Sequence, residues 1–357
     1  MINAYDLSAF QLAEVLLGWG QPRYRAEQVY TGLWRRNAAF EEMTNLPGSL
    51  RQRLATELPA RLEVITEQGA DHGRTVKALL RVGPERLVET VLMGYRDRVT
   101  VCVSSQEGCA MRCGFCATGQ MGLVGSLTPG EIAAQVVWAR RAAASLPDST
   151  PQRVTNVVFM GMGEPMANYA ATRDAIGLLL DPAGMNLAAR HVTVSTVGLV
   201  PGIRRLAVDH PQVGLAVSLH AASDDLRSRL VPVNKRWPLH DLERAIDDWR
   251  LITRRRPSLE WTLMDGVNDD LGQASLLAPM ARRLTAHVNL IPLNPTPDSA
   301  EGASPPGRVA AFAASLRQAG VTVTVRDTRG RTIDAACGQL RRESEPVSWR
   351  TPRPGRA

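Results

Sequence analysis

Short apolar runs alternate with amphipathic stretches in regular succession from residue 98 onward. The amphipathic stretches have helical spacing, and the first long one opens with Thr128, Pro129 and Glu131, which is a capping-box start. The apolar runs are predicted as β-strands: "RVTVCVSS", "TNVVFMGM", "HVTVSTVG", "VGLAVSLH", "SLEWTLM", "HVNLIPL" and "GVTVTVR". This alternation predicts an α/β fold with a parallel sheet and crossover helices, wound as an open sheet or a barrel.

The flanking parts of the chain have a different pattern. Residues 1–61 carry apolar positions at helical spacing, such as Phe10, Leu12 and Val15, beside many arginines, which predicts a basic helical unit. Residues 62–97 contain β-like runs broken by glycine turns, which predicts a small β linker segment. Residues 341–357 are polar, proline-rich and aperiodic, which predicts a disordered basic tail after a core over 98–340.

The charge balance favours a polyanionic partner. The chain has 42 basic and 35 acidic residues, a formal net charge of +7, and only Lys77 and Lys235 are lysine. Because the planar fork of arginine matches phosphate and stacks on bases, nucleic acid is a candidate partner. Codon bias in a GC-rich genome explains the same arginine content, so charge alone does not decide between the two.

Targeting signals are not evident in the sequence. No apolar run approaches the ~18 residues that a membrane span needs, and the first 20 residues lack the pattern of a secretory signal. Five cysteines, an odd number with three crowded together, suit a reduced compartment better than a secreted disulfide framework. We therefore expect a cytoplasmic protein without membrane association.

Three of the five cysteines lie in one glycine-rich loop, "EGCAMRCGFCATGQMG", with the spacing C-x3-C-x2-C at Cys109, Cys113 and Cys116. A closed zinc site needs four ligands, and neither the other cysteines nor any histidine stands at the usual zinc-pair spacing. A [4Fe-4S] cluster has four irons, so three thiolates would leave one iron open to a small molecule. The loop therefore indicates an open iron–sulfur cluster, with zinc as the alternative.

Further polar residues follow the predicted strands. Gly163 and Glu164 of "GMGEP" come after "NVVF", where glycine lets the backbone approach a ligand and the carboxylate can accept from an ammonium group. Ser195, Ser218 and His220 end two later strands. In parallel α/β folds the chemistry lies beyond the carboxyl ends of the strands, so these side chains are candidate ligands of one site. Taken singly, the first motif fits a plain turn and the histidine fits a structural role.

The cysteine spacing, with Phe115 before the last cysteine, resembles the signature of the radical S-adenosylmethionine superfamily. Over nearly its whole length the chain further resembles the bacterial adenine-C2 RNA methyltransferases of that superfamily, the RlmN-like enzymes. The second resemblance is carried by these segments: "VCVSSQEGCAMRCGFCATGQMG", "VVFMGMGEPMANY", "VTVSTVGLVPGI", "LAVSLHAASDDLRSRLVPVNKRW", "VNLIPLNPTP" and "IDAACGQL".

The resemblance implies a fold, a substrate and cofactors. The fold would be a partial (β/α)6 radical S-adenosylmethionine barrel with an N-terminal helical accessory domain and the small β linker segment. The substrate would be an adenosine in the peptidyl-transferase region of 23S rRNA, with the tRNA adenosine next to the anticodon as a further candidate. The cofactors would be a [4Fe-4S] cluster and S-adenosylmethionine, two molecules per turnover, with electrons from a cellular donor such as flavodoxin.

The resemblance also implies a covalent route, because adenine C2 is too electron-poor to attack a sulfonium methyl group. In the family, the cysteine that matches Cys337 is first methylated, and a 5′-deoxyadenosyl radical then removes hydrogen from that methyl group. The resulting carbon radical joins the protein to C2. Cys102 matches the thiol that resolves this adduct by forming a disulfide with Cys337, and Glu89 matches the proton acceptor.

The match also implies a set of cofactor-binding residues, with the leucine acting through its backbone: Gly163, Glu164, Ser195, Ser218, Leu219, His220 and Asn294. Two alternatives remain open. The sister enzymes that methylate adenine C8 and confer antibiotic resistance share the cysteines and the radical. A non-catalytic RNA-binding protein that holds an iron–sulfur cluster or zinc would also account for the cysteine loop.

Overall fold

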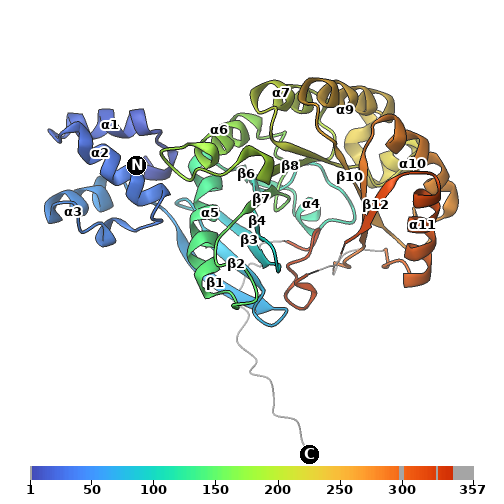
Figure 1. Ribbon diagram of the computed structural model, residues 1–357, viewed down its shortest axis with the longest axis horizontal. Coiled ribbons are helices and arrows are strands. Elements are labelled where there is room, and N and C mark those ends of the chain that lie inside the picture. Colours follow the sequence, from blue (N-terminus) through green and yellow to red (C-terminus); the bar gives the residue numbers. More distant parts are fainter. Residues whose placement is uncertain (1, 297–300, 327–328, 341–357) are drawn as a thin grey trace, which may run out of the picture.

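The computed structural model describes residues 2–296, 301–326 and 329–340, so the predicted tail over 341–357 lies outside the described residues. One ten-stranded sheet dominates the fold, in the order β1-β2-β3-β4-β7-β8-β9-β10-β11-β12 (Figure 1). Seven neighbouring strands are parallel: β4 (Val99–Cys102), β7 (Asn156–Phe159), β8 (Val192–Thr196), β9 (Gly214–Ser218), β10 (Ser258–Leu263), β11 (His287–Pro292) and β12 (Thr322–Val325).

All seven predicted apolar runs contain one of these strands, so the strand predictions are confirmed. The first six parallel strands each lead into a helix on the way to the next strand, which is the predicted partial (β/α)6 barrel, and β12 adds a seventh strand at the edge. Inner strands such as β9 are buried on both faces, which is why their runs are continuously apolar.

Helices cover the outer face of the parallel strands (Figure 1). The longer ones are α5 (Pro129–Ala142), α6 (Tyr169–Leu180), α7 (Val200–Asp209), α9 (Leu239–Thr253), α10 (Leu271–Arg283) and α11 (Pro306–Gln318). The predicted capping box starts α5: the hydroxyl of Thr128 accepts from the N–H of Glu131 at 3.2 Å, and the Glu131 carboxylate accepts from the N–H of Thr128 at 3.0 Å. Both hydrogen bonds of the capping box therefore form within the first turn of α5.

The segment predicted as a β linker forms three antiparallel strands, β1 (Glu63–Ala70), β2 (Thr75–Arg81) and β3 (Leu87–Gly94). Strand β3 pairs with β4, where Val91 stands opposite Cys102. These strands therefore continue the barrel sheet without a break, and they bring residues of β3 next to a cysteine of the first parallel strand.

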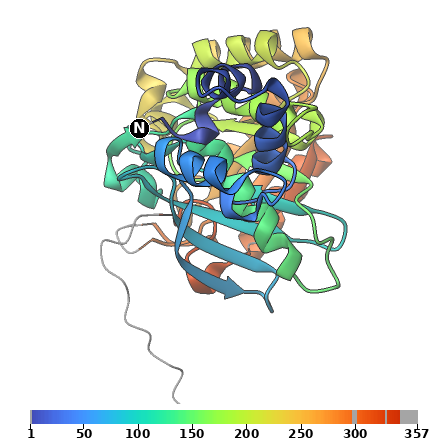
Figure 2. The same ribbon diagram turned by 90° about the vertical axis from the view of Figure 1, so that its left-hand side faces the viewer.

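The N-terminal segment contains three α-helices, α1 (Ala9–Gly18), α2 (Arg23–Trp34) and α3 (Gly48–Glu57), with η1 (Ala4–Asp6) and η2 (Phe40–Glu42). They lie together at one side of the molecule, in front of the sheet in Figure 2. The N–H of Gly130 on α5 donates to the carboxylate of Asp6 at 2.8 Å, and Arg140 donates to the carbonyl oxygen of Trp34 at 2.9 Å. The helical unit is thus anchored on α5.

Candidate active site

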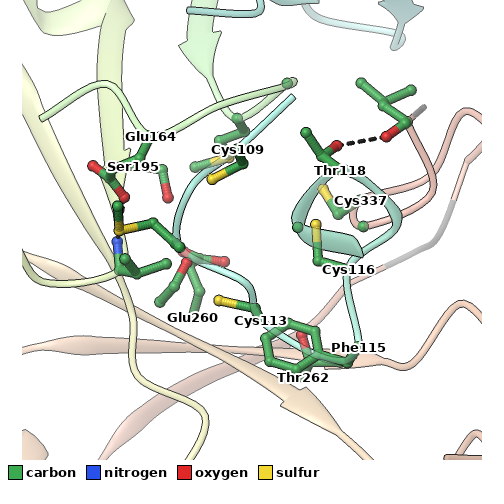
Figure 3. Close-up of a pocket in the computed structure, with 18 of the residues that line it drawn as sticks. Cys109, Cys113, Phe115, Cys116, Thr118, Glu164, Ser195, Glu260, Thr262 and Cys337 are labelled. Atoms are coloured by element: carbon green, nitrogen blue, oxygen red, sulfur yellow. Dashed lines mark hydrogen bonds between the residues drawn. The ribbon is translucent and has the colours of Figure 1, made fainter. Parts of the chain in front are cut away.

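The cysteine loop is held at its base by a short hairpin. Strands β5 (Gln106–Gly108) and β6 (Leu123–Ser126) pair antiparallel, and the loop between them contains α4 (Ala117–Met121). Gly108 has a φ of +76°, and a Cβ there would stand 1.9 Å from the carbonyl oxygen of Gly122, so only glycine fits this crossing. The hairpin therefore delivers Cys109, Cys113 and Cys116 to one side of a cavity at the carboxyl ends of the strands (Figure 3).

The chemistry of the three thiols fits a cluster. Burial raises the pKa of all three, to about 12 for Cys109, so they ionise only when a strong positive charge enters the cavity. Within the part of the chain that the structure describes, no three His, Cys, Asp or Glu side chains converge closely enough to hold a single metal ion. Thiols spread around an open centre suit the separate irons of a [4Fe-4S] cluster better than one zinc ion.

The motif after β7 lines the same cavity, next to Cys109 (Figure 3). Gly163 has a φ of +95°, and a Cβ there would lie 2.7 Å from the backbone nitrogen of Gln106. The Glu164 carboxylate accepts from the N–H groups of Met166 at 2.9 Å and Val197 at 2.8 Å, which fixes it facing the cysteines beside Ser195 (Figure 3). Burial raises the pKa of Glu164 to about 7. A cationic group bound beside it would favour its ionised form.

The cavity brings together most of the predicted site residues and encloses about 1010 Å³ of empty space, part of it open to solvent. The predicted residues that line it are Cys109, Cys113, Cys116, Gly163, Glu164, Ser195, Ser218, His220 and Cys337. The sequence missed Glu260, which also lines the cavity and whose carboxylate accepts from Ser258 at 2.6 Å and Asn289 at 2.7 Å. A charged residue inside the apolar run "SLEWTLM" was the available signal.

His220 follows β9 with a φ of +60° and is 4% exposed. Its Nδ1 accepts from the N–H of Thr262 at 3.0 Å, and its ring meets Phe115 edge to face with centroids 4.7 Å apart. Burial, with the nearby charge of Arg227, lowers the pKa of His220 to about 3. The imidazole is therefore neutral, with its proton on Nε2.

Replacing His220 with asparagine is expected to reduce the acid sensitivity of folding. The unfolded chain binds a proton at His220 below pH 6.5 and the folded chain does not until about pH 3, so stability falls as pH drops through this window. Between pH 7.5 and pH 5, this difference in proton binding lowers the free energy of unfolding by about 2 kcal/mol. Asparagine tolerates positive φ and can accept a hydrogen bond from the N–H of Thr262, so it should preserve the local structure. Between the same two pH values, the free energy of unfolding of His220→Asn, measured with urea, should therefore fall by about 2 kcal/mol less than that of the unaltered chain.

The matched control is His240→Asn, because His240 is exposed on α9. This variant should lose as much stability between the two pH values as the unaltered chain. If His220→Asn shows the same loss as the control, His220 is not the buried neutral group described above.

Two predicted cofactor residues do not line this cavity. Leu219 is buried, its N–H donates to the carbonyl oxygen of Glu260 at 2.9 Å, and its own carbonyl oxygen accepts from Arg227 at 3.1 Å. Asn294 lines a second, smaller cavity, and its Nδ2 donates to the carbonyl oxygen of Cys337 at 3.3 Å. Its Oδ1 is buried and has no hydrogen-bond partner among the residues that the structure describes. The cofactor roles of both residues stay predictions.

The sequence also missed Arg227 of α8 (Asp224–Leu230), which is 0% exposed. Its guanidinium donates to the carbonyl oxygens of Val197 at 2.6 Å, Ser218 at 3.2 Å and Leu219, and to the side chain of Asn234 at 2.8 Å. Burial lowers its pKa to about 10, so it remains charged at neutral pH. It holds together the ends of β8 and β9, where the predicted cofactor residues lie.

Replacing Arg227 with methionine is expected to lower the free energy of unfolding by about 3–5 kcal/mol, because buried carbonyl oxygens lose their donor. Arg227→Lys should recover only part of this, since an ammonium group cannot reach acceptors spread over two strand ends. Arg229→Met, on the exposed side of the same helix, should change stability by less than about 0.5 kcal/mol. Urea denaturation of the three variants measures the differences, and equal losses for positions 227 and 229 would contradict the assigned role.

The loop that carries Cys337 is bonded directly to the cysteine loop. The N–H of Ala117 donates to the carbonyl oxygen of Gly338 at 2.8 Å, and the hydroxyl of Thr118 donates to that of Leu340. Cys337 therefore faces the main cavity beside Cys116 (Figure 3). It also lines the second cavity, which Cys102 shares. The two thiols that the sequence assigned to covalent chemistry thus meet at one small space.

The environments of these two thiols differ. Cys102 is buried on β4, and burial together with the nearby Cys337 raises its pKa to about 12. The Cys337 sulfur accepts a hydrogen bond from the guanidinium of Arg326 at 3.0 Å. Cys102 is therefore a protonated thiol at neutral pH, whereas the sulfur of Cys337 has a cationic hydrogen-bond donor beside it.

Glu89 lines neither cavity. It lies on β3, is 5% exposed, and its carboxylate is 3.0 Å from the Nζ of Lys77. It shares the inward face of β3 with Val91, which stands opposite Cys102. Glu89 is thus two residues along β3 from the partner of Cys102 but does not lie on the surface of either cavity, and its role as proton acceptor stays a prediction.

Known proteins resemble the chain over nearly its whole length. A model described as "Ribosomal RNA large subunit methyltransferase N-terminal domain" matches residues 2–58, and one described as "Radical SAM superfamily" matches residues 103–274. The chain is 47% identical to the "Probable dual-specificity RNA methyltransferase RlmN" of Roseiflexus castenholzii, with 95% of each protein covered. It is 50% identical to the protein of the same name from Salinispora tropica, with 94% of this chain and 91% of that protein covered.

A solved structure is similar throughout. The crystal structure of a radical SAM methyltransferase from Sphaerobacter thermophilus superposes with a TM-score of 0.91 at 49% identity, covering 96% of this chain and 99% of that one. Separately, none of the helices in the described ranges is long and apolar enough to cross a membrane.

Proposed function

We propose the function of this chain from one premise: the chain belongs to the RlmN family of radical S-adenosylmethionine RNA methyltransferases. It is therefore an enzyme that methylates RNA. Membership of the superfamily implies a [4Fe-4S] cluster and S-adenosylmethionine. The product we infer is 2-methyladenosine in the peptidyl-transferase region of 23S rRNA, and the tRNA adenosine next to the anticodon is inferred as a second substrate.

The single observation that carries the proposal is one cavity with three cluster thiols and a fourth, separate thiol, Cys337. Cys109, Cys113 and Cys116 would hold the cluster, which would supply the electron for reductive cleavage of S-adenosylmethionine. A plain iron–sulfur or zinc protein has no need for Cys337 at the rim of that cavity, with Cys102 behind it. The arrangement favours the enzyme over the non-catalytic alternative.

Different residues around the cavity are proposed to bind different groups of S-adenosylmethionine. Glu164 is fixed by two backbone donors and faces the cysteines, so it suits the ammonium group of S-adenosylmethionine. Ser195 and Ser218 offer hydroxyl groups to polar atoms of the same ligand. His220 is neutral and presents Nε2–H as a donor. Gly163 leaves the backbone accessible at the same wall.

Cys337 carries the methyl group in this proposal. Its sulfur attacks the methyl carbon of one S-adenosylmethionine, and the bond from that carbon to the sulfonium breaks, so that S-adenosylhomocysteine leaves with the electron pair. The methylated sulfur then lines both the main cavity and the second one. After the methylene carbon has joined adenine C2, the Cys102 sulfur attacks the Cys337 sulfur and the bond from that sulfur to the carbon breaks. Its electron pair stays with the RNA, where a proton completes the methyl group, and a disulfide remains on the protein. Glu89 is proposed to take the C2 proton, because it lies two residues along β3 from Val91, the residue that stands opposite Cys102.

The RNA is proposed to lie against the N-terminal helices as well as the site. Arg23 and Arg36 of this unit are exposed, and the unit protrudes beside the barrel (Figure 1). Exposed arginines suit the phosphates of folded RNA, whereas the target adenosine must be turned out of its stack to reach a buried thiol. We infer a cytoplasmic location from this substrate and from thiols that must stay reduced, with a flavodoxin-like protein as the electron donor.

Two measurements test the proposal. Loss of 2-methyladenosine from digested 23S rRNA of a deletion strain supports it, and loss of 8-methyladenosine instead assigns the chain to the C8 alternative. Purified enzyme tested separately on rRNA fragments and tRNA decides the second substrate. Anaerobic reconstitution addresses the other alternative: zinc without iron, or iron without reductive cleavage of S-adenosylmethionine, contradicts an enzymatic role.

A further inference from the structure

The loop that carries Cys337 is anchored at both of its ends on other parts of the chain. This Cys337 loop, residues 329–340, ends on the cysteine loop through the hydrogen bonds already described. It begins on the turn between β1 and β2, where the Oδ2 of Asp71 accepts from the N–H of Gly330 at 3.0 Å. The antiparallel strands that precede the barrel therefore hold the start of the segment that presents the Cys337 sulfur.

The Asp71 side chain is itself fixed. Asp71 has a φ of +53° in the turn and is half-buried. The hydroxyl of Thr75, at the start of β2, donates to the same Oδ2 at 2.6 Å. The two segments also touch closely here, because a Cβ on Gly330 would stand 3.1 Å from the Cγ2 of Thr75. The hairpin thus offers Gly330 an acceptor whose position is set by a second hydrogen bond.

Gly330 connects this contact to the backbone near Cys337. It has a φ of +69°, and a Cβ there would stand 2.6 Å from the Cβ of Ala335. Its carbonyl oxygen accepts from the N–H groups of Ile333 at 3.2 Å and Ala335 at 3.0 Å. These bonds close η6 (Arg331–Ile333), which ends four residues before Cys337. The position of Gly330 therefore determines where the turn before Cys337 lies.

A second contact joins the same two segments. The guanidinium of Arg329 donates to the carbonyl oxygen of Gly94, at the end of β3, at 3.5 Å. It also lies over the ring of Tyr95, 4.8 Å from the ring centroid. Strand β3 pairs with β4, which carries Cys102. The three antiparallel strands therefore contact both the strand of one reactive thiol and the loop of the other.

We propose that Asp71 is a positioning residue, which holds the Cys337 loop through Gly330 so that the Cys337 sulfur lines both cavities. The inference rests on the proposed function, in which the methylated sulfur serves a ligand in the main cavity and Cys102 in the second. A displacement of about 1 Å at a reacting group can slow a reaction by about 100-fold. Asp71 lines neither cavity, so its loss should slow methyl transfer to RNA without impairing cleavage of S-adenosylmethionine.

The first test is hydrogen exchange in the full chain, read by peptic digestion and mass spectrometry. Asp71→Gly removes the carboxylate and keeps a residue that adopts positive φ without strain. The amides of residues 330–336 should exchange roughly ten-fold faster in this variant, because a hydrogen bond that holds the turn is lost. The matched control is His72→Gly: His72 is exposed in the same turn with a φ of +57°, and its loss should leave this exchange unchanged.

The second test separates positioning from folding. After anaerobic reconstitution, Asp71→Gly should bind as much iron as His72→Gly and should form 5′-deoxyadenosine from S-adenosylmethionine at the same rate without RNA. It should form 2-methyladenosine in RNA at least about ten-fold more slowly than the control. Asp71→Asn should recover most of the methylation rate and of the exchange protection, because asparagine tolerates positive φ and its amide oxygen can accept from Gly330.

Three results would overturn the inference: equal exchange of residues 330–336 in Asp71→Gly and His72→Gly, no recovery in Asp71→Asn, or a loss of methylation no larger than the loss of S-adenosylmethionine cleavage. The exchange comparison depends on no RNA product. If the unaltered chain forms no 2-methyladenosine, the proposed function fails and the exchange result still stands. The two failures are therefore distinguishable.

Discussion

Replacing Cys113 with alanine is expected to abolish iron binding and reductive cleavage of S-adenosylmethionine. Cys113 is buried in the middle of the cysteine loop, and the remaining two thiols cannot hold three corners of a cluster. Residues that only support metal ligands already cost 10–100-fold when removed, so we expect the loss of a ligand to exceed about 100-fold in RNA methylation. Iron content after reconstitution and 5′-deoxyadenosine formation measure the two effects.

The control for this variant is Cys102→Ala, which removes a buried cysteine of similar size outside the loop. It should bind as much iron as the unaltered chain and should still cleave S-adenosylmethionine. Full iron content in Cys113→Ala would mean that the three thiols of the loop do not form the metal site.

Cys102→Ala itself is expected to stop the reaction after the protein has joined the RNA. Cys337 would still accept a methyl group and deliver its carbon to the adenine, but the thiol that shares the second cavity with it would be missing and could not attack the sulfur. A covalent complex of protein and RNA should therefore accumulate, up to about one per chain, while turnover falls by more than about 1000-fold. Denaturing gels detect the complex, and mass spectrometry after nuclease digestion locates the nucleotide on Cys337.

A double variant, Cys102→Ala with Cys337→Ala, supplies the matched control and should give no covalent complex. Repeated turnover by Cys102→Ala would show that another group resolves the adduct. A complex that survives in the double variant would show that the attachment point is not Cys337. Either outcome would remove the disulfide step from the proposed mechanism.

The parallel strands could be predicted from the sequence because each one is recognisable from the apolar pattern of its own residues. A buried strand of a parallel sheet is apolar on both faces, and a run such as "HVNLIPL" reveals this without knowledge of its neighbours. The capping box at Thr128 is similarly contained in four residues. The family, the fold class and the enzyme class, which the motifs predicted by resemblance, are confirmed by relatives about half identical over nearly the whole chain.

Other parts of the site depend on contacts that no short window of sequence contains. Arg227 could not be distinguished from the exposed Arg229 two residues later, because only the fold brings the ends of β8 and β9 around it. Arg326 meets Cys337 because the chain turns back after β12. Asn294 was predicted at the cofactor, yet in the structure its amide reaches the backbone of Cys337, since the loop after β11 lies against that segment.

The hydrogen bonds from Ala117 and Thr118 to the Cys337 loop have a consequence for biosynthesis. The Thr118 and Leu340 partners are separated by 222 positions, so the emerging chain exposes the three thiols proposed to hold the cluster long before the segment that covers them is translated. Metal inserted during translation would face oxygen and water on that side until the last barrel strand and its following turn had left the ribosome. Maturation of this enzyme therefore favours loading the cluster into a completed chain.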